Sequence, residues 1–335
     1  MKKKSILMLF VIFLCAISMF ACGKKSKTTG KDITICLDWT PNTNHTGIYV
    51  ALAKGYYKDA GLNVTIVQPP EGGATLMCAS GEAQFAIDAQ DTLAAAFDRE
   101  NPLDVTAVAP ILQHNTSGIL SRKGDGITSP KGLAGKHYST WDSPIELAII
   151  KYCMEKDGAD FKTLALLPNN ITNEPAALGA LQTDAIWIFY GWSGINAELS
   201  DVECDYFAFK DIAPELDYYT PVIIANNDYL ERNSKEAKAF MEATAKGYEF
   251  AAANPREAAD ILLDGDNTGA LLGAMDLVYA SQEWIGEQYL DEDGRWGTID
   301  EERWNTFYKW LYENQLTQKD LTGLGYNTDW SKSDE

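Results

Sequence analysis

The stretch ITICLDWTPNTNHTGIYVALAKGYYKDAGLNVTIV, residues 33–67, has the clearest structural pattern in the sequence. It opens on an apolar strand at 33–37 and continues through the polar loop 38–45 into a segment whose apolar residues have helical spacing and which stops at Gly61. A second strand follows at 63–67. A strand, a helix and a second strand of these lengths predict a right-handed βαβ unit with parallel strands.

The same alternation continues along the chain. Further strands are expected at 84–87, 105–112, 136–140, 164–167, 185–189 and 219–225. The clearest helix between them is 144–155, because Ser143 is a good N-cap and Pro144 fits the first helical position. After about Ser234 the chain reads as largely helical to Asn314. The pattern predicts an α/β protein with two lobes, each built on a mixed, mostly parallel sheet, joined by two crossovers near 113–117 and 216–221.

The N-terminus has the composition of an export signal. Lys2, Lys3 and Lys4 precede an apolar run, residues 6–21, which is short for a membrane span. The run ends in MFACG, residues 19–23, which resembles a lipobox, so that Cys22 would carry a diacylglycerol after cleavage; the alternative is an ordinary cysteine of a signal anchor. The expected division is a signal peptide at 1–21, a lipidated tether at 22–30, lobe I with the C-terminal helices at 31–113 and 221–335, and lobe II at 114–220.

The charge of the chain limits its partners. A net charge of −20 over 335 residues argues against nucleic acid, whose phosphates need a basic surface. It also opposes adsorption to an anionic bilayer. The protein is therefore expected to be a monomer that contacts the outer face of the cytoplasmic membrane through its lipid alone. Of the six cysteines, Cys15 and Cys22 belong to the N-terminal export segment. The other four, none in CxxC spacing, are expected to be buried thiols, with a disulfide left open and a metal cluster not expected: Cys36, Cys78, Cys153 and Cys204.

Six loops follow predicted strands, which is where α/β lobes place their ligand contacts. The loops are 38–45, 70–75, 88–92, 114–118, 140–146 and 187–192. None of them contains a lysine or an arginine, whereas they hold six acids and six large aromatic residues. A pocket for a sulfonate, phosphate or carboxylate normally supplies a guanidinium or an ammonium group. These loops instead predict a flat ligand with amino groups or protonatable ring nitrogens, clamped by aromatic faces and hydrogen-bonded to carboxylates or amides.

The residues expected to contact the ligand come from these loops. They are Asp38, Trp39, Asn42, His45, Asp88, Gln90, Asn115, Trp141, Ser143, Glu146, Trp187, Tyr190 and Trp192. Several have an equally good structural explanation. Trp39 and Trp187 would also fill a core, and Glu146 would also complement the dipole of its helix. Asp88 would also cap the next helix, and His45 would also satisfy backbone groups at a helix start. No catalytic residue, cofactor or metal site is expected.

Several of these motifs occur together in a known family. They are LDWTPNTNHTG (37–47), YYK (56–58), GL (61–62), QPPEGGA (68–74), QHNTSG (113–118), SPIE (143–146), WIFYGW (187–192) and LDYYTP (216–221). Over nearly all of the mature chain they resemble the formylaminopyrimidine-binding proteins of thiamine-salvage ABC importers. The resemblance implies a type 2 periplasmic-binding-protein fold and a cleft that closes on its ligand. It also implies transfer of a pyrimidine, formylaminopyrimidine or hydroxymethylpyrimidine, to an ABC permease and its ATPase.

The same superfamily includes an enzyme, the fungal-type thiamine pyrimidine synthase, which consumes its own histidine and bound pyridoxal phosphate. Its reactive Lys-x-x-x-His falls here on Asp88 and Thr92, and its phosphate-binding loop falls on WDSP at 141–144, where an acid would repel phosphate. Its cysteine-rich iron motif has no counterpart in the sequence. These departures favour a binding protein over an enzyme. Two other ligand classes remain as alternatives, a larger heterocycle such as riboflavin and an alkylsulfonate, of which the second is disfavoured by the lack of cations.

Overall fold

The computed structural model describes residues 30–169, 171–328 and 330. Residues 31–335 form one compact unit. The expected signal peptide, Cys22 and the tether up to residue 29 lie outside the described residues. Within the part that is described, no helix has both the length and the apolar character needed to cross a bilayer.

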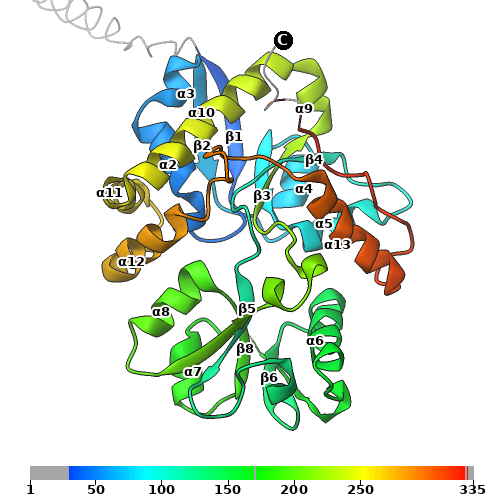
Figure 1. The fold of residues 1–335 in the computed structure, drawn as a ribbon. Coiled ribbons are helices and arrows are strands. Elements are labelled where there is room, and N and C mark those ends of the chain that lie inside the picture. The colour runs from blue at the N-terminus through cyan, green and yellow to red at the C-terminus, as the bar shows by residue number, and fades with distance from the viewer. Residues whose placement is uncertain (1–29, 170, 329, 331–335) are drawn as a thin grey trace, which may run out of the picture. The chain divides into compact units, whose positions relative to one another are not determined.

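Lobe I is built on a five-stranded mixed sheet (Figure 1). Its strands are β1 (Lys31–Cys36), β2 (Leu62–Val67), β3 (Phe85–Asp88), β4 (Val105–Pro110) and β10 (Val222–Asn226). Their order is β2-β1-β3-β10-β4. Strand β1 pairs in parallel with β2 and β3, whereas β10 runs antiparallel between β3 and β4. The predicted βαβ unit and the mixed, mostly parallel sheet are therefore confirmed.

Helices cover both faces of this sheet (Figure 1). They are η1 (Thr43–His45), α2 (Thr46–Ala53), α3 (Tyr56–Asp59), α4 (Ala74–Ala79), α5 (Gln90–Phe97), α9 (Asn227–Arg232), α10 (Ser234–Ala253), α11 (Pro255–Gly265), α12 (Met275–Gly286) and α13 (Glu301–Glu313). The single helical segment expected between the loop 38–45 and Gly61 is divided into α2 and α3. The division falls at Gly55, whose φ of 79° is left-handed and ends the first helix.

Lobe II repeats the plan with a second five-stranded sheet. Its strands are β5 (Ser117–Arg122), β6 (His137–Thr140), β7 (Ala165–Pro168), β8 (Ala185–Phe189) and β9 (Cys204–Ala208), in the order β7-β6-β8-β5-β9. Around them lie η2 (Pro130–Leu133), α6 (Pro144–Lys156), η3 (Phe161–Thr163), α7 (Glu174–Gly179), the π-helical turn η4 (Tyr190–Gly194), α8 (Ile195–Glu198), η5 (Phe209–Asp211) and η6 (Pro214–Leu216). Strands β5 and β9 were not expected. Ser117 and Gly118 have weak strand propensity, yet β5 forms because it is paired on both sides, with β8 and β9.

Two connections join the sheets, the first connection near residues 113–117 and the second connection near residues 216–221. They are hydrogen-bonded to each other and contact α13. The backbone N–H of Asn115 donates to the carboxylate of Asp217 (2.9 Å), and the Asn115 side chain donates to the carbonyl of Leu216 (2.8 Å). His114 contacts the same carboxylate (2.7 Å), and the guanidinium of Arg303 on α13 lies 3.5 Å from it. Asp217 is thus the common partner of two connections and one helix.

Helix α13 also packs on both lobes. Phe307 stacks on Tyr218 of the second connection with ring centroids 4.1 Å apart. One turn later Trp310 meets the edge of Tyr152 on α6 of lobe II, at 5.4 Å. These contacts belong to one hydrophobic core that is continuous between the lobes on this side of the molecule. These packed residues hold the two lobes together along α13.

Helices α2 and α10 cross at two glycines, and the crossing gives a stability prediction. A methyl group at Gly247 would lie 2.0 Å from the carbonyl oxygen of Gly47, a backbone atom that cannot move aside easily. We expect Gly247→Ala to lower the free energy of unfolding by about 2–3 kcal/mol through this overlap. Urea denaturation measures the change. In Gly286→Ala, on α12, the nearest atom lies 3.6 Å from the added methyl, so this control should stay within about 1 kcal/mol of the wild type. Equal losses in both variants would contradict the prediction.

Candidate functional site

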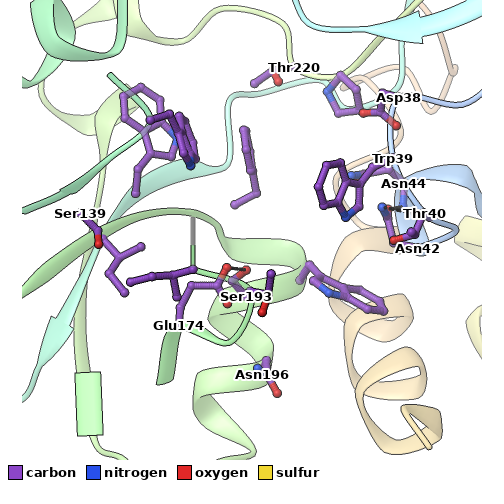
Figure 2. Close-up of a pocket in the computed structure, with 18 of the residues that line it drawn as sticks. Asp38, Trp39, Thr40, Asn42, Asn44, Ser139, Glu174, Ser193, Asn196 and Thr220 are labelled. Carbon is purple, nitrogen blue, oxygen red and sulfur yellow. Dashed lines mark hydrogen bonds between the residues drawn. The ribbon is translucent and has the colours of Figure 1, made fainter. Parts of the chain in front are cut away.

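A cavity of about 540 Å³ lies where the strand ends of the two lobes face each other (Figure 2). Lobe I lines it with the loop after β1 and with Thr220 and Pro221. Lobe II lines it from the ends of β6 and β8, from the segment after β7 and from η4. The volume falls in the range of small-molecule sites. Both lobes therefore contribute to one site, and a change in their separation changes its size.

Six of the expected contact residues line this cavity. They are Asp38, Trp39, Asn42, Trp141, Trp187 and Trp192. Trp39 of lobe I is 62 % exposed and Trp141 of lobe II is 53 % exposed, so neither indole fills a core. Trp187 differs, because it is 4 % exposed and packs on Phe209 at 4.2 Å and on Trp141 at 5.7 Å. Trp187 thus forms the floor beneath Trp141, while Trp39 and Trp141 present aromatic surface from opposite lobes.

Glu146 lies under the loop that carries Trp141 and does not line the cavity. Its buried carboxylate accepts the hydroxyl protons of Tyr138 (2.6 Å) and Thr140 (3.0 Å). It also accepts the backbone N–H groups of Trp141 (3.1 Å) and Ser143 (3.3 Å). Burial, with Glu146 as the second cause, raises the pKa of Tyr138 well above its usual value. Glu146 and Ser143, both expected as ligand contacts, therefore fix the loop that presents Trp141.

His45 is also placed behind the cavity wall. The backbone N–H of Asn42 donates to its Nδ1 (3.2 Å), so Nδ1 carries a lone pair and the ring proton is on Nε2. Nε2 lies 2.8 Å from Oδ1 of Asp38 and donates to it. His45 is completely buried and outside the lining. It therefore orients the Asp38 carboxylate, which does line the cavity.

Asp88 and Gln90, at the end of β3, support the site from within lobe I. Asp88 accepts hydrogen bonds from the hydroxyls of Thr75 and Thr92, and burial raises its pKa. Gln90 is completely buried, donating to the carbonyl of Trp304 (2.8 Å) and accepting from the backbone of Tyr219 (2.9 Å). Neither lines the cavity. Gln90 instead joins α5 to α13 and to the second connection.

The remaining two expected contacts also lie outside the lining. Asn115 is completely buried in the connection between the sheets, where its side-chain oxygen accepts from the backbone N–H of Ser117 (2.8 Å). Tyr190 donates to Glu198 and packs against Trp284 at 5.1 Å, and burial raises its pKa to about 12. Both hold neighbouring structure in place.

Glu174 is the most consequential lining residue that the sequence did not reveal. It begins α7, where Asn173 is the N-cap, accepting from the backbone N–H of Ala176 (3.1 Å), and Pro175 follows at the helix start. Ser193 of η4 donates to the Glu174 carboxylate at 3.1 Å. The signal that could have found it is the run Asn-Glu-Pro, a helix start after a strand of the same kind as Ser143-Pro144. Eight further polar residues missed at that stage line the cavity: Thr40, Asn44, Ser139, Asn169, Thr172, Ser193, Asn196 and Thr220.

The lining is acidic. Its ionisable groups are the carboxylates of Asp38 and Glu174, and among the described residues that line it there is no lysine, arginine or histidine. Elsewhere in the described chain, no group of three or more His, Cys, Asp or Glu side chains has the arrangement of a metal site. The four cysteines described have free thiols, and burial raises the pKa of Cys153 to about 12, which makes that thiol unreactive.

The family follows from a sequence comparison. The family model described as NMT1/THI5 like matches residues 42–258, which include the loop of Asn42, the cavity floor and the second connection. The chain belongs to this family. The resemblance inferred from the motifs is therefore confirmed at the level of the family.

Two relatives show the range of the NMT1/THI5-like family. The chain is 27 % identical over 311 residues to the formylaminopyrimidine-binding protein of Halalkalibacterium halodurans, covering 90 % of this chain and 92 % of that protein. It is 26 % identical over 247 residues to a 4-amino-5-hydroxymethyl-2-methylpyrimidine phosphate synthase of Saccharomyces cerevisiae, covering 68 % of each. The family thus contains both binding proteins and enzymes.

Solved structures confirm the predicted fold of this NMT1/THI5-like chain. A putative periplasmic sulfonate-binding protein of an ABC transporter from Methylobacillus flagellatus superposes with a TM-score of 0.65 at 16 % identity, over 90 % of this chain and 93 % of that one. At this identity the likeness establishes the periplasmic-binding-protein fold alone. The ligand has to be argued from the residues of the cavity.

Proposed function

We propose that the chain is the solute-binding component of an ABC importer. We further propose that its ligand is a thiamine-precursor pyrimidine, formylaminopyrimidine or hydroxymethylpyrimidine, bound in the cavity between the lobes. The observation that carries the proposal is the composition of the lining, in which tryptophans from both lobes accompany two carboxylates and no described cation. The likeness to a formylaminopyrimidine-binding protein over 90 % of the chain supports the same ligand class.

The lining groups suit an aminopyrimidine. Trp39 and Trp141 stack on the two faces of the ring as the lobes close, and Asp38 and Glu174 accept its N–H groups. Stacking contributes about 1–3 kcal/mol for each aromatic side chain. Each hydrogen bond to a carboxylate contributes about 1.5–3 kcal/mol. Together these terms account for much of the roughly 8–12 kcal/mol that corresponds to micromolar to nanomolar affinity.

The proposal includes binding without chemistry. At the positions where the related synthases have their reactive lysine and histidine, this chain has Asp88 and Thr92, which are hydrogen-bonded to each other. A carboxylate and a hydroxyl supply neither the Schiff-base amine nor the imidazole that such chemistry consumes. Mass spectrometry after incubation of the protein with either pyrimidine should recover the compound unchanged.

The proposal extends to the location of the protein. The N-terminal sequence supports export, cleavage before Cys22 and a diacylglycerol anchor on the outer face of the cytoplasmic membrane. A monomer delivering its ligand to a permease and its ATPase is the arrangement that fits two lobes around one cavity. Metabolic labelling with a radioactive fatty acid, lost in Cys22→Ser, tests the anchor.

The ligand claim is tested by isothermal titration calorimetry. We expect both pyrimidines to bind with micromolar or tighter affinity and to quench tryptophan fluorescence, because two lining indoles are exposed in the free protein. Riboflavin and an alkanesulfonate are the comparison ligands. Preferential binding of the alkanesulfonate, or no heat from either pyrimidine with folded protein, would reject the proposed ligand.

A further inference from the structure

We infer that the cavity binds its pyrimidine as a cation, with one extra proton on a ring nitrogen, held by the carboxylates of Asp38 and Glu174. The inference rests on the proposed function and specifies which charge state of the ligand is bound. It also means that the protein rejects planar heterocycles of the same shape that do not protonate. Its basis is the net charge of the lining, which depends on the protonation state of one buried histidine.

That histidine does not neutralise the site. If His45 were protonated, it would place a positive charge beside Asp38, since its Nε2 lies 2.8 Å from the carboxylate. However, its Nδ1 accepts the backbone N–H of Asn42 at 3.2 Å, and a protonated Nδ1 cannot accept a hydrogen bond. The ring is therefore neutral, with its single proton on Nε2. Asp38 gains a hydrogen-bond donor from His45 but no compensating positive charge.

The groups around Asp38 add to that charge. Asp88, at the end of β3, is close enough that Asp38 contributes to its raised pKa, although burial is the main cause. Cys36 on β1 and Tyr248 on α10 are the other titratable groups affected by Asp38, and burial is the main cause of the raised pKa of each. No lysine or arginine of the described residues pairs with Asp38 in a salt bridge. The lobe I half of the site is therefore negative.

Glu174 brings a second charge from lobe II (Figure 2). Its described partner is the neutral hydroxyl of Ser193. The titratable groups on the neighbouring η4 and α8 are Tyr190 and Glu198, which are hydrogen-bonded to each other. The guanidinium of Arg122 on β5 donates to the carbonyl of Leu178, at the opposite end of α7. The lobe II half therefore also lacks a compensating cation at the cavity.

Closure of the lobes brings these two charges into a smaller and drier space. Two carboxylates that lose water without a compensating cation oppose closure, because like charges repel more strongly and ions are less stable in a low dielectric. A protonated aminopyrimidine removes that cost, since it adds one positive charge and presents its ring N–H and amino N–H as charge-assisted donors. A neutral ring would leave the closed cavity with a net charge of about −2, the sum of the two carboxylates. The cationic form is therefore the one that the closed state stabilises.

Proton uptake on binding tests the inference directly. The probe is hydroxymethylpyrimidine, titrated into the full chain at pH 8 in phosphate and in Tris, whose ionisation enthalpies differ. We expect uptake of close to one proton per ligand bound. We also expect the Kd to rise about tenfold for each pH unit above the pKa of the free ligand, because the cationic fraction falls tenfold. Tight binding with no proton uptake would overturn the inference and leave the proposed function intact, whereas no binding at any pH would reject the proposed function itself.

Variants separate the ligand proton from protein protons. Glu174→Gln keeps the size of the side chain and removes its charge, and should weaken binding at pH 7 at least tenfold and reduce proton uptake. Glu203→Gln, an exposed acid of lobe II, is its matched control and should change neither quantity. Asp91 is the protein group that has to be excluded as the site of proton uptake, since burial and the nearby Asp88 raise its pKa to about 6. Asp91→Asn should therefore retain the full uptake, and its loss in that variant would overturn the inference.

A second ligand gives an independent measurement. A ring-fluorinated aminopyrimidine of nearly the same shape protonates less readily, so fewer of its molecules are cations at a given pH. We expect its affinity at pH 7 to be lower by the ratio of the two cationic fractions. Equal affinities for the two compounds would show that ligand charge is not selected. Thermal unfolding of each variant without ligand establishes that it is folded.

Discussion

We expect Glu146→Ala to lower the free energy of unfolding by about 3–5 kcal/mol. The carboxylate accepts from the buried hydroxyls of Tyr138 and Thr140 and from the backbone N–H groups of Trp141 and Ser143, in the loop that precedes α6. Removing the acceptor leaves buried donors without a partner, and each such donor costs about 1–3 kcal/mol. Urea denaturation followed by circular dichroism measures the loss.

The same helix supplies the control. Glu155, about two and a half turns further along α6, is exposed and lies 3.9 Å from Lys151 across the helix surface. A surface pair of this kind contributes little, so Glu155→Ala should change the free energy of unfolding by less than about 0.5 kcal/mol. Similar losses in the two variants would show that helix propensity, and not the network under the Trp141 loop, accounts for the effect. At temperatures where Glu146→Ala is still folded, its ligand affinity should also fall, because Trp141 is no longer held in place.

The architecture was largely predictable because strands and helices alternate and are separated by recognisable cap and turn residues. The helix Pro144–Lys156 was located from its N-cap and first proline, and β8 from five consecutive residues between turn signals. Strand β5 was missed because its Ser-Gly start is weak and its stability comes from pairing with β8 and β9, which are distant in sequence. Such non-local pairing leaves no periodic pattern in a single short segment.

The site was predictable only in part, and the reason lies in the loops after the strands. Trp39 and Trp141 were found because the loops after the strands are rich in large aromatic residues, although for Trp39 a place in the core was an equally good explanation. Gln90 and Asn115 occupy similar positions in the sequence, yet both point inward and hold the connections between the sheets. A loop residue can face the cavity or the framework behind it, and composition does not distinguish the two directions. Glu174 was missed because the loop after β7 carried no aromatic residue to draw attention to it.

The residues that turned inward explain how the cavity can open and close. Gln90 joins the second connection to α5, and Asn115 joins it to the first connection. Arg303 and Phe307 join the second connection to α13. The connections are thus fixed by buried hydrogen bonds and stacked rings, and α12 of lobe I also contacts lobe II, where Ser281 donates to the carbonyl of Gly191 and Trp284 packs on Tyr190 at 5.1 Å. A ligand that bridges Trp39 and Trp141 would add contacts between the lobes and so favour closure.

The aromatic pair gives the largest expected change in binding. Trp39→Ala and Trp141→Ala should each weaken binding of the pyrimidine by about 1–3 kcal/mol, a factor of roughly 5–150 in Kd, because each removes one stacking face. Both side chains are more than half exposed, so the free energy of unfolding should change little. The double variant should lose about 2–6 kcal/mol, and calorimetry with hydroxymethylpyrimidine measures all three affinities.

Two further variants separate stacking from other roles of these indoles. Trp39→Phe keeps an aromatic face and should retain most of the affinity, whereas Tyr312→Ala on α13 removes a comparably exposed ring outside the lining and should leave the Kd unchanged. The structure places Trp39 and Trp141 on opposite lobes, so near-additive losses are expected only if both rings contact one ligand in the closed state. If the folded Trp141→Ala variant bound the pyrimidine as tightly as the wild type, the ligand would be held by lobe I alone and closure would not depend on the ring.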